Sequence, residues 1–511
     1  MKIRALVIWA VMGIGVTSAA AMALPVPPPS RAPDDGDARS KTIARTTEGK
    51  PVDASGAHFT AGQTLLVDSR LGHASLPQSN LPGATAETYV LSSVTGADAS
   101  GAIAPPLNLA IVLDRSGSMA KNNRMNNAIA AAVTAVEHMR DVDSVTVVSF
   151  DTSARVVVSP TRTLASTRPS IEAAIRTITV MGDTCISCGL DEAMRVLRTS
   201  AAAPDSVNRI LLLSDGEATH GVKDVPGMRA MAARMRTEGF AITTLGVDVD
   251  FDERMMTALA SESNGGHYFV RDPSELPAIF AREFQTLESS VARDAELSIE
   301  LAPGTEVLEV FDRSFRTERV GGASPATRVI VPFGTFAARE EKTVLMRVRV
   351  PTDREGREPI ARVRLSYRDL VERRAASCQG DLSMAVTVGT SQPQLDSFVA
   401  ARLERSKTAK TLTDANDLFG KGQADAALSL LAARRAEIAE VEKTATASAS
   451  AAPAKPKGKD LADDFAQQAG AVDTATKNFK PTPATTPPPP TSTAGKTATK
   501  SNAEIAMPMS L

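Results

Sequence analysis

The sequence contains few aromatic residues and no clear excess of either charge. Its 511 residues include a single Trp, Trp9, and three Tyr. Because single-stranded nucleic acid and sugars are usually held by stacking on such side chains, this scarcity argues against that kind of site. The 57 basic and 59 acidic side chains give a formal net charge of −2. Without a basic excess, electrostatic binding to nucleic acid or to anionic lipid is excluded as the main function.

Residues for zinc sites and for phosphate-binding loops are scarce as well. Five His and three Cys leave little material for a zinc site. No glycine-rich loop followed by Lys-Ser or Lys-Thr comes after an apolar run, which excludes a P-loop. After the N-terminal run, no stretch is long and apolar enough to cross a membrane. Hydrophobic residues nevertheless make up 43% of the chain, enough for a sizeable core in two or three domains.

The N-terminus has the composition of a secretory signal peptide. Met1-Lys2-Ile3-Arg4 is followed by an apolar run to about Ala21 and then by small residues. A basic start, a short apolar stretch and an Ala-x-Ala site predict a signal peptide over residues 1–23. A retained anchor helix is the alternative, because the run is barely long enough to span a bilayer. We therefore expect an exported protein, periplasmic or secreted, without stable membrane insertion after cleavage.

The rest of the chain changes its pattern several times. Apolar runs that alternate with amphipathic helical periods predict an α/β fold with a doubly wound, mostly parallel sheet. Residue-by-residue alternation between turns predicts an all-β sandwich, whose missing strands come from the segment before the α/β unit. The predicted regions are a disordered linker (24–50), β strands of the sandwich (51–104), the α/β domain (105–288), the β-sandwich (289–390), a short helical hairpin (391–443) and a disordered low-complexity tail (444–511).

One group of polar residues lies directly after the first predicted strand of the α/β domain. The motif Asp114-Arg115-Ser116-Gly117-Ser118 follows an apolar run. In an open parallel sheet, ligands bind beyond the carboxyl ends of the strands. One carboxylate and two hydroxyls at alternate positions of such a turn are suitable ligands for a hard cation. Thr184, before a predicted helix, and Asp215, after another apolar run, carry matching oxygens.

In this combination the sequence resembles a von Willebrand factor type A domain with a metal-ion-dependent adhesion site. The resemblance covers about residues 107–288 and includes the segments 208–216 and 265–269. The wider layout is similar to bacterial secreted proteins of the YfbK and inter-alpha-trypsin-inhibitor heavy-chain style. The resemblance implies hydroxyl ligands from Ser116, Ser118 and Thr184. It also implies that Asp114 and Asp215 act directly or through water. Mg²⁺ is the expected ion, with Ca²⁺ and Mn²⁺ as alternatives.

Such a site is suited to binding rather than to catalysis. Neutral hydroxyls dominate its ligands, so an ion there is incompletely neutralised and keeps one octahedral position open. A Glu or Asp carboxylate from a partner protein supplies both the ligand and the charge. The sequence thus predicts a non-enzymatic, metal-dependent protein-binding module of the adhesion type, with no catalytic residue. A cell-envelope assembly or scaffolding factor is the first alternative. A metal-dependent hydrolase is disfavoured, because it needs a positioned base or nucleophile.

Several other residues are open to more than one interpretation. Cys185 and Cys188 predict a disulfide in an exported protein, with free thiols as the alternative. Cys378 is then either buried and inert or available for an intermolecular bridge. The acidic segment 248–252 forms a second cation site or, as we prefer, supplies Asp252 as a helix N-cap. His220, the His nearest to Asp215 in the sequence, is expected to be solvated.

Overall fold

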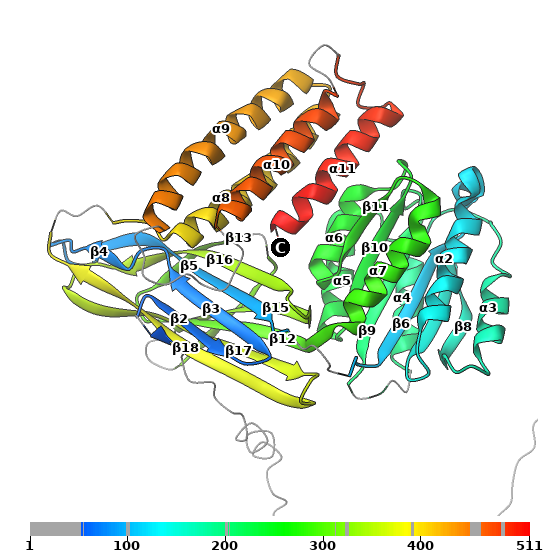
Figure 1. Cartoon of the computed structure of the whole chain (residues 1–511), viewed down its shortest axis with the longest axis horizontal. Helices are drawn as coiled ribbons and strands as arrows, with labels where there is room; N and C mark the ends of the chain where they lie inside the picture. Colours follow the sequence, from blue (N-terminus) through cyan, green and yellow to red (C-terminus); the bar gives the residue numbers. More distant parts are fainter. Residues whose placement is uncertain are drawn as a thin grey trace, which may run out of the picture. The chain divides into compact units, whose positions relative to one another are not determined.

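The computed structural model describes residues 53–510 except for 55, 99–102, 200–202, 204, 312, 322–325, 390–392, 450–460 and 482–485. The predicted signal peptide (1–23) and linker (24–50) lie outside the described residues. The described chain forms an α/β domain, a β-sandwich and a group of C-terminal helices (Figure 1).

The α/β domain is built on a six-stranded sheet (Figure 1). In spatial order its strands are β11 (His267–Val270), β10 (Ala241–Val247), β9 (Val207–Ser214), β6 (Leu107–Asp114), β7 (Ser144–Phe150) and β8 (Ala154–Arg162). Only the pair β7–β8 is antiparallel, so the sheet is mostly parallel, as predicted. The central strand β6 is buried at every position, which explains its almost continuous apolar sequence.

Helices cover both faces of this sheet. They are η1 (Gly117–Asn123), α2 (Arg124–His138), α3 (Arg168–Ile175), α4 (Ile186–Leu197), α5 (Val225–Thr237), α6 (Glu253–Ser263), η2 (Pro273–Glu275) and α7 (Leu276–Glu288). Leu109, Ile111 and Leu113 of β6 pack with α2 and α7, whereas Ala110 and Val112 pack with α4, α5 and α6. Because successive side chains of a strand point to opposite faces, an apolar strand requires a cover on each face. The doubly wound prediction is confirmed.

Two further six-stranded sheets form the β-sandwich. One contains β1 (Asp53–Ala54), β2 (His58–Gly62), β3 (Leu65–Leu71), β5 (Thr85–Gly96), β16 (Glu341–Pro351) and β13 (Glu306–Phe311) in that order. The other contains β14 (Arg316–Val320), β15 (Ala326–Ala337), β12 (Ser290–Leu301), β17 (Gly356–Asp369), β18 (Arg374–Thr387) and β4 (Ser75–Pro77). Val67 and Val90 of the first sheet share one buried cluster with Leu297 and Val363 of the second. Because β5 pairs with β16, the α/β domain is an insertion between strands of one sheet.

The C-terminal helices are α8 (Ser397–Gly420), α9 (Ala424–Ala449), α10 (Leu461–Phe479) and α11 (Thr493–Ser510). α8 and α9 lie where the helical hairpin was expected. The prediction of a disordered tail over 444–511 was wrong for the end of α9, for α10 and for α11. Leu461, Phe465, Val472 and Phe479 recur at helical spacing and are buried in one cluster with residues of α8 and α9. The abundant Ala, Thr and Lys of this segment concealed that apolar face.

α11 also contacts the α/β domain. Lys500 Nζ donates to the Phe251 carbonyl at 2.7 Å and lies 3.8 Å from the centre of the Phe251 ring. Lys496 Nζ pairs with Asp250 Oδ1 at 3.0 Å. Both lysines therefore bind the loop between β10 and α6.

The start of α6 gives a prediction about pH. Burial raises the pKa of Glu253 from 4.5 to about 7, although nearby Lys500 and Arg254 lower it. A folded-state pKa above the unfolded value means that the folded state holds the proton more tightly. The contribution of Glu253 to stability is therefore complete below about pH 4.5 and is lost as the pH rises through about 7. We expect Glu253→Gln to match the wild type in acid and to be more stable by about 2–3 kcal/mol near pH 8.

Denaturant unfolding of both proteins at several pH values measures this difference. Glu440→Gln, at an exposed acid of α9, is the control for replacing a carboxylate by an amide. If the free energies of unfolding of E253Q and the wild type differed by the same amount in acid and near pH 8, the prediction would be contradicted.

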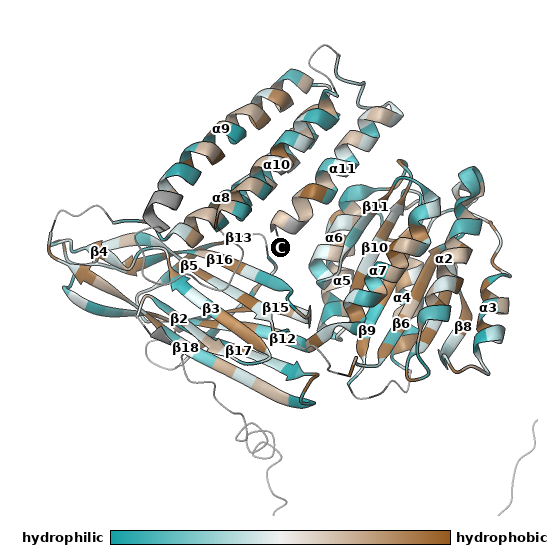
Figure 2. Cartoon of the chain, in the orientation of Figure 1, coloured by the Kyte–Doolittle hydropathy of each residue, from teal (hydrophilic) through white to brown (hydrophobic). Residues whose placement is uncertain are grey.

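The hydropathy of the chain follows this architecture. Figure 2 shows hydrophobic residues concentrated along the strands of the α/β sheet and hydrophilic residues on the outer parts of its helices. Among the residues that the structure describes, no helix has an apolar stretch long enough to cross a bilayer.

Candidate metal centre

The predicted ligands lie at the carboxyl ends of two neighbouring strands. Asp114 is the last residue of β6, and Asp215 directly follows β9. These strands pair in parallel, with Leu113 opposite Leu213, so both carboxylates leave the sheet at the same edge. Strands that end together at the centre of an open sheet create the crevice in which ligands usually bind.

Asp114 is fully buried and is held by two hydrogen bonds. Its Oδ1 accepts from the Ser116 backbone N–H at 2.8 Å, and its Oδ2 accepts from Ser214 Oγ at 2.5 Å. Burial raises the pKa of Asp114 from 3.8 to about 6, against these hydrogen bonds, and the nearby Asp215 carboxylate raises it further. Asp114 and Asp215 are neighbouring buried acids, so a positive charge beside them stabilises their ionised forms.

The hydroxyls lie beside these acids. Ser116 Oγ and Ser118 Oγ are 3.1 Å apart, and Ser118 Oγ donates to Asp215 Oδ1 at 2.6 Å. Neighbouring oxygens around an octahedral Mg²⁺ are about 3.0 Å apart, because each bond is about 2.1 Å long. A Cβ added at Gly216 would lie 3.4 Å from Thr184 Oγ1 and 3.6 Å from Ser118 Oγ, so both hydroxyls face the space beside Gly216. The chemistry and spacing of these oxygens fit a hard divalent cation.

Thr184 is fixed in place by its neighbours. The disulfide predicted between Cys185 and Cys188 is confirmed, with their Cα atoms 5.3 Å apart at the start of α4. The Thr184 carbonyl accepts from the backbone N–H groups of Thr219 and His220, at 2.8 and 3.0 Å. The disulfide thus closes the turn directly after Thr184, and the loop after β9 holds the Thr184 carbonyl.

Gly221 in that loop leaves no room for a side chain. Its φ is +71°, and a Cβ would lie 2.2 Å from Ser187 Oγ and 2.7 Å from Cys185 Sγ. The loop therefore packs directly on the first turn of α4, next to the disulfide.

The motif turn is braced by the segment before Thr184. The Gly117 N–H donates to the Gly182 carbonyl at 3.0 Å, and the Met181 N–H donates to the Arg115 carbonyl at 2.7 Å. Arg115 itself forms an ion pair with the buried Asp151. These contacts join two segments that the sequence identified separately.

Two residues of the site were missed by sequence analysis. Ser214 donates to Asp114, and Arg124 donates from Nη1 to Asp215 Oδ2 at 2.5 Å. Arg124 is only 2% exposed, although a charged residue at the start of a helix is usually solvated. No neighbouring residue in the sequence indicates that Arg124 belongs to the site. Ser214 could have been found, because it precedes the predicted ligand Asp215.

The remaining candidates have structural explanations. Asp252 accepts from the Met255 N–H at 3.0 Å and caps α6, as preferred over a second cation site, and Asp248 forms an ion pair with Arg124. The His220 side chain is 45% exposed, in line with a solvated residue. Cys378 is buried, and burial raises the pKa of its thiol to about 12, which favours the inert alternative.

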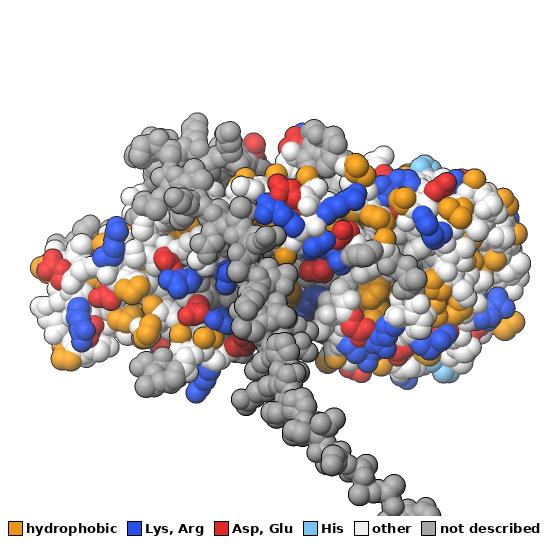
Figure 3. All heavy atoms as spheres, turned by 90° about the horizontal axis from the view of Figure 1, so that it is seen from below, with side chains coloured by type: hydrophobic (Ala, Val, Ile, Leu, Met, Phe, Trp, Pro, Cys, Tyr) orange, Lys and Arg blue, Asp and Glu red, His pale blue; other side chains and the backbone are white. Residues whose placement is uncertain are grey.

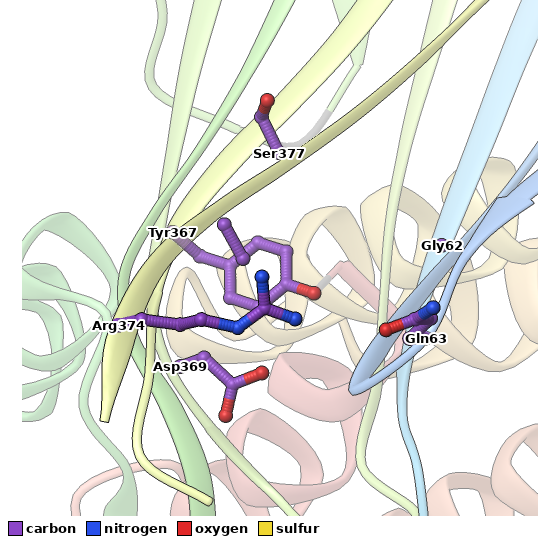
Figure 4. Close-up of a pocket in the computed structure, with 7 residues that line it drawn as sticks. Gly62, Gln63, Tyr367, Asp369, Arg374 and Ser377 are labelled. Atoms are coloured by element: carbon purple, nitrogen blue, oxygen red, sulfur yellow. The ribbon is translucent and has the colours of Figure 1, made fainter. Parts of the chain in front are cut away.

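A hollow in the β-sandwich is less suited to a ligand. Figure 4 shows Gln63 across from Tyr367, Asp369 and Arg374. The Asp369 carboxylate already accepts from Thr64 Oγ1 at 2.6 Å and from the Val371 N–H at 2.9 Å. The Asp369 carboxylate in this hollow is therefore already engaged in hydrogen bonds within the sandwich.

Comparison with known proteins agrees with this geometry. Residues 108–282 match the family model of the von Willebrand factor type A domain. This part of the chain is a VWA domain. VWA domains typically bind a divalent metal at a metal-ion-dependent adhesion site and often mediate protein interaction or adhesion.

Similar proteins share more than this domain in some cases. The Synechocystis protein sll0103 is 25% identical over 334 residues, which are 62% of this chain and 76% of that protein. Escherichia coli YfbK is 28% identical over 39% of this chain, and mouse inter-alpha-trypsin inhibitor heavy chain H2 is 25% identical over 40%. These matches cover only 34% of YfbK and 22% of heavy chain H2.

A solved structure extends the likeness in fold. It is described as von Willebrand factor type A from Catenulispora acidiphila. Its TM-score is 0.60 at 19% identity, over 85% of this chain and 93% of that chain. The two therefore share a fold that extends beyond the VWA domain.

Proposed function

We propose that this chain is a non-enzymatic, metal-dependent protein-binding module. In this proposal Asp114, Ser116, Ser118, Thr184 and Asp215 hold a divalent cation, and a partner protein binds it through a Glu or Asp carboxylate. The observation that carries the proposal is the close group of Ser116, Ser118 and Asp215 oxygens, with contacts of 3.1 and 2.6 Å, at the edge where β6 and β9 end.

The residues that this chain contributes to the site favour binding of a carboxylate from a partner. When bound, the cation supplies positive charge and an open coordination position for an oxygen ligand. Ser116, Ser118 and Thr184 contribute neutral hydroxyls, and Asp215 already shares its charge with Arg124. The chain therefore under-neutralises a divalent charge, which leaves an attraction for a carboxylate. We propose Mg²⁺ as the ion, with Ca²⁺ or Mn²⁺ as alternatives.

The proposed compartment is the periplasm or the exterior of the cell. The Cys185–Cys188 disulfide supports it, because such bonds persist in oxidising compartments. On the described surface visible in Figure 3, basic and acidic side chains are interspersed. This mixture is in line with a protein partner rather than nucleic acid.

Affinity capture tests the function. The purified chain is immobilised and offered an envelope extract in Mg²⁺ and in EDTA, beside Ser118→Ala. We expect a partner that is retained in Mg²⁺, lost in EDTA and reduced at least about tenfold by S118A, because the hydroxyl that contacts both Ser116 and Asp215 is gone.

Ser75→Ala is the matched control, since Ser75 is an exposed serine on β4 of the sandwich. It should retain the partner as the wild type does. Identical retained proteins in Mg²⁺ and in EDTA would contradict the proposed function.

A further inference from the structure

Arg124 is a buried cation between two acids. It is the first residue of α2 and is only 2% exposed. Its Nη1 donates to Asp215 Oδ2 at 2.5 Å, and its Nη2 forms an ion pair with Asp248. Asp215 Oδ1 meanwhile accepts from Ser118. The Asp215 carboxylate is thus shared between the proposed cation site on one side and the guanidinium on the other.

The backbone around this ion pair adopts an uncommon conformation. Asn122 (φ 49°), Asn123 (φ 56°) and Asp248 (φ 62°) are all in the left-handed region, which non-glycine residues seldom adopt. Asn122 Nδ2 donates to Asp248 Oδ2 at 3.1 Å. Such conformations cost free energy and persist where the surrounding structure requires them. These residues stand at the junction of η1 and α2 and directly after β10, where Arg124 meets both Asp248 and Asp215.

The loop that carries Asp248 is also held from its other side. Lys500 of α11 donates to the Phe251 carbonyl, and Val249 N–H donates to Asp248 Oδ1 at 2.8 Å. The Asp248 carboxylate is therefore a fixed partner of Arg124 rather than a mobile surface charge.

We propose that Arg124 is a positioning residue that restrains Asp215 and weakens the site's hold on a divalent cation, while Asp248 offsets part of its charge. This inference rests on the proposed function. The Arg124 guanidinium lies one carboxylate away from the cation site, so its positive charge opposes a second positive charge there. It also engages one oxygen of Asp215, which limits how far this acid can neutralise a cation. More of the cation's charge is then left for the partner's carboxylate.

Two substitutions should change metal affinity in opposite directions. Arg124→Met removes the opposing charge and frees Asp215, so we expect Mg²⁺ to bind about tenfold more tightly. Asp248→Asn leaves the charge of Arg124 without its offset, so we expect Mg²⁺ to bind more weakly, by about the same factor. Asparagine tolerates the left-handed backbone of position 248, so D248N keeps the loop. Titration calorimetry with Mg²⁺ alone measures both effects.

Thermal unfolding in EDTA and in Mg²⁺ provides a second measurement. R124M leaves the buried Asp215 and the partly buried Asp248 without their guanidinium partner. We therefore expect it to unfold at a lower temperature in EDTA and to gain more from Mg²⁺ than the wild type. Arg140→Met is the matched control, because Arg140 pairs with Asp143, in the loop before β7, away from the strand ends that carry the ligands. R140M should lower stability without changing Mg²⁺ affinity. Arg124→Lys keeps the charge and should bind Mg²⁺ as weakly as the wild type does.

The outcomes separate this inference from the proposed function. A wild-type chain that binds no Mg²⁺ would contradict the proposed function itself. A wild type that binds Mg²⁺, with R124M binding equally or more weakly, would show that Arg124 is only structural and would overturn the inference. R124K binding as tightly as R124M would overturn it as well. If R124M does not fold, D248N decides: weaker Mg²⁺ binding supports the inference, and equal or tighter binding overturns it.

Discussion

Asp114→Asn is expected to abolish Mg²⁺ binding, with at least about a hundredfold loss of affinity, because a carboxylate beside the cation is replaced by a neutral amide. The fold should survive. The amide oxygen still accepts from the Ser116 N–H, and the amide nitrogen can donate to Ser214 Oγ, which now donates to Asp114 Oδ2 at 2.5 Å. One of two neighbouring buried acids is also removed, which relieves their repulsion.

The same substitution should therefore raise the unfolding temperature in EDTA. Relief of about 1 kcal/mol corresponds to about 2–4 °C for a domain of this size. The stabilisation that Mg²⁺ gives to the wild type should disappear in D114N. Calorimetric titration and thermal unfolding, each with and without Mg²⁺, measure the two effects.

Asp381→Asn is the matched control for D114N. Asp381 pairs with Arg362 on the exposed side of the sandwich, so D381N should leave Mg²⁺ binding unchanged. A D114N protein that still binds Mg²⁺ like the wild type would remove Asp114 from the site.

Phe479→Ala is expected to destabilise the helical bundle by about 3–5 kcal/mol, the usual cost of removing a large buried aromatic side chain. Phe479 of α10 is fully buried, and its ring stacks on Phe419 of α8 with centroids 4.3 Å apart. The substitution leaves a cavity against Phe419 that the surrounding helices fill only partly. Urea unfolding followed by far-UV circular dichroism measures the loss.

Phe315→Ala is the control for F479A, because Phe315 is 44% exposed. Its loss should cost well under about 1 kcal/mol. If F479A unfolded like F315A, α10 would not belong to the bundle core. The tail would then be as loosely ordered as its composition suggested.

Most of the α/β fold followed from local sequence pattern. The apolar run of β6 requires a cover on both faces, and the motif that begins at Asp114 stands where such a strand ends. Asp114, Ser116, Ser118 and Asp215 follow two neighbouring parallel strands, β6 and β9, that end at the same edge of the sheet. Both the strands and the motif are defined by residues close together in the sequence, so the sequence alone was enough to predict them.

Long-range pairing was decided only by the tertiary structure. Arg124 and Asp215 are 91 positions apart, and Arg124 and Asp248 are 124 apart. Nothing near Arg124 distinguishes it from a solvated helix start, because burial of a charge depends on which acids the fold brings to it. The same holds for α10 and α11, whose sparse apolar residues form a core only when α8 and α9 cover them. A strand or a motif can be predicted from neighbouring residues. A buried ion pair or a weakly apolar helix face cannot, because its burial depends on residues that are distant in the sequence.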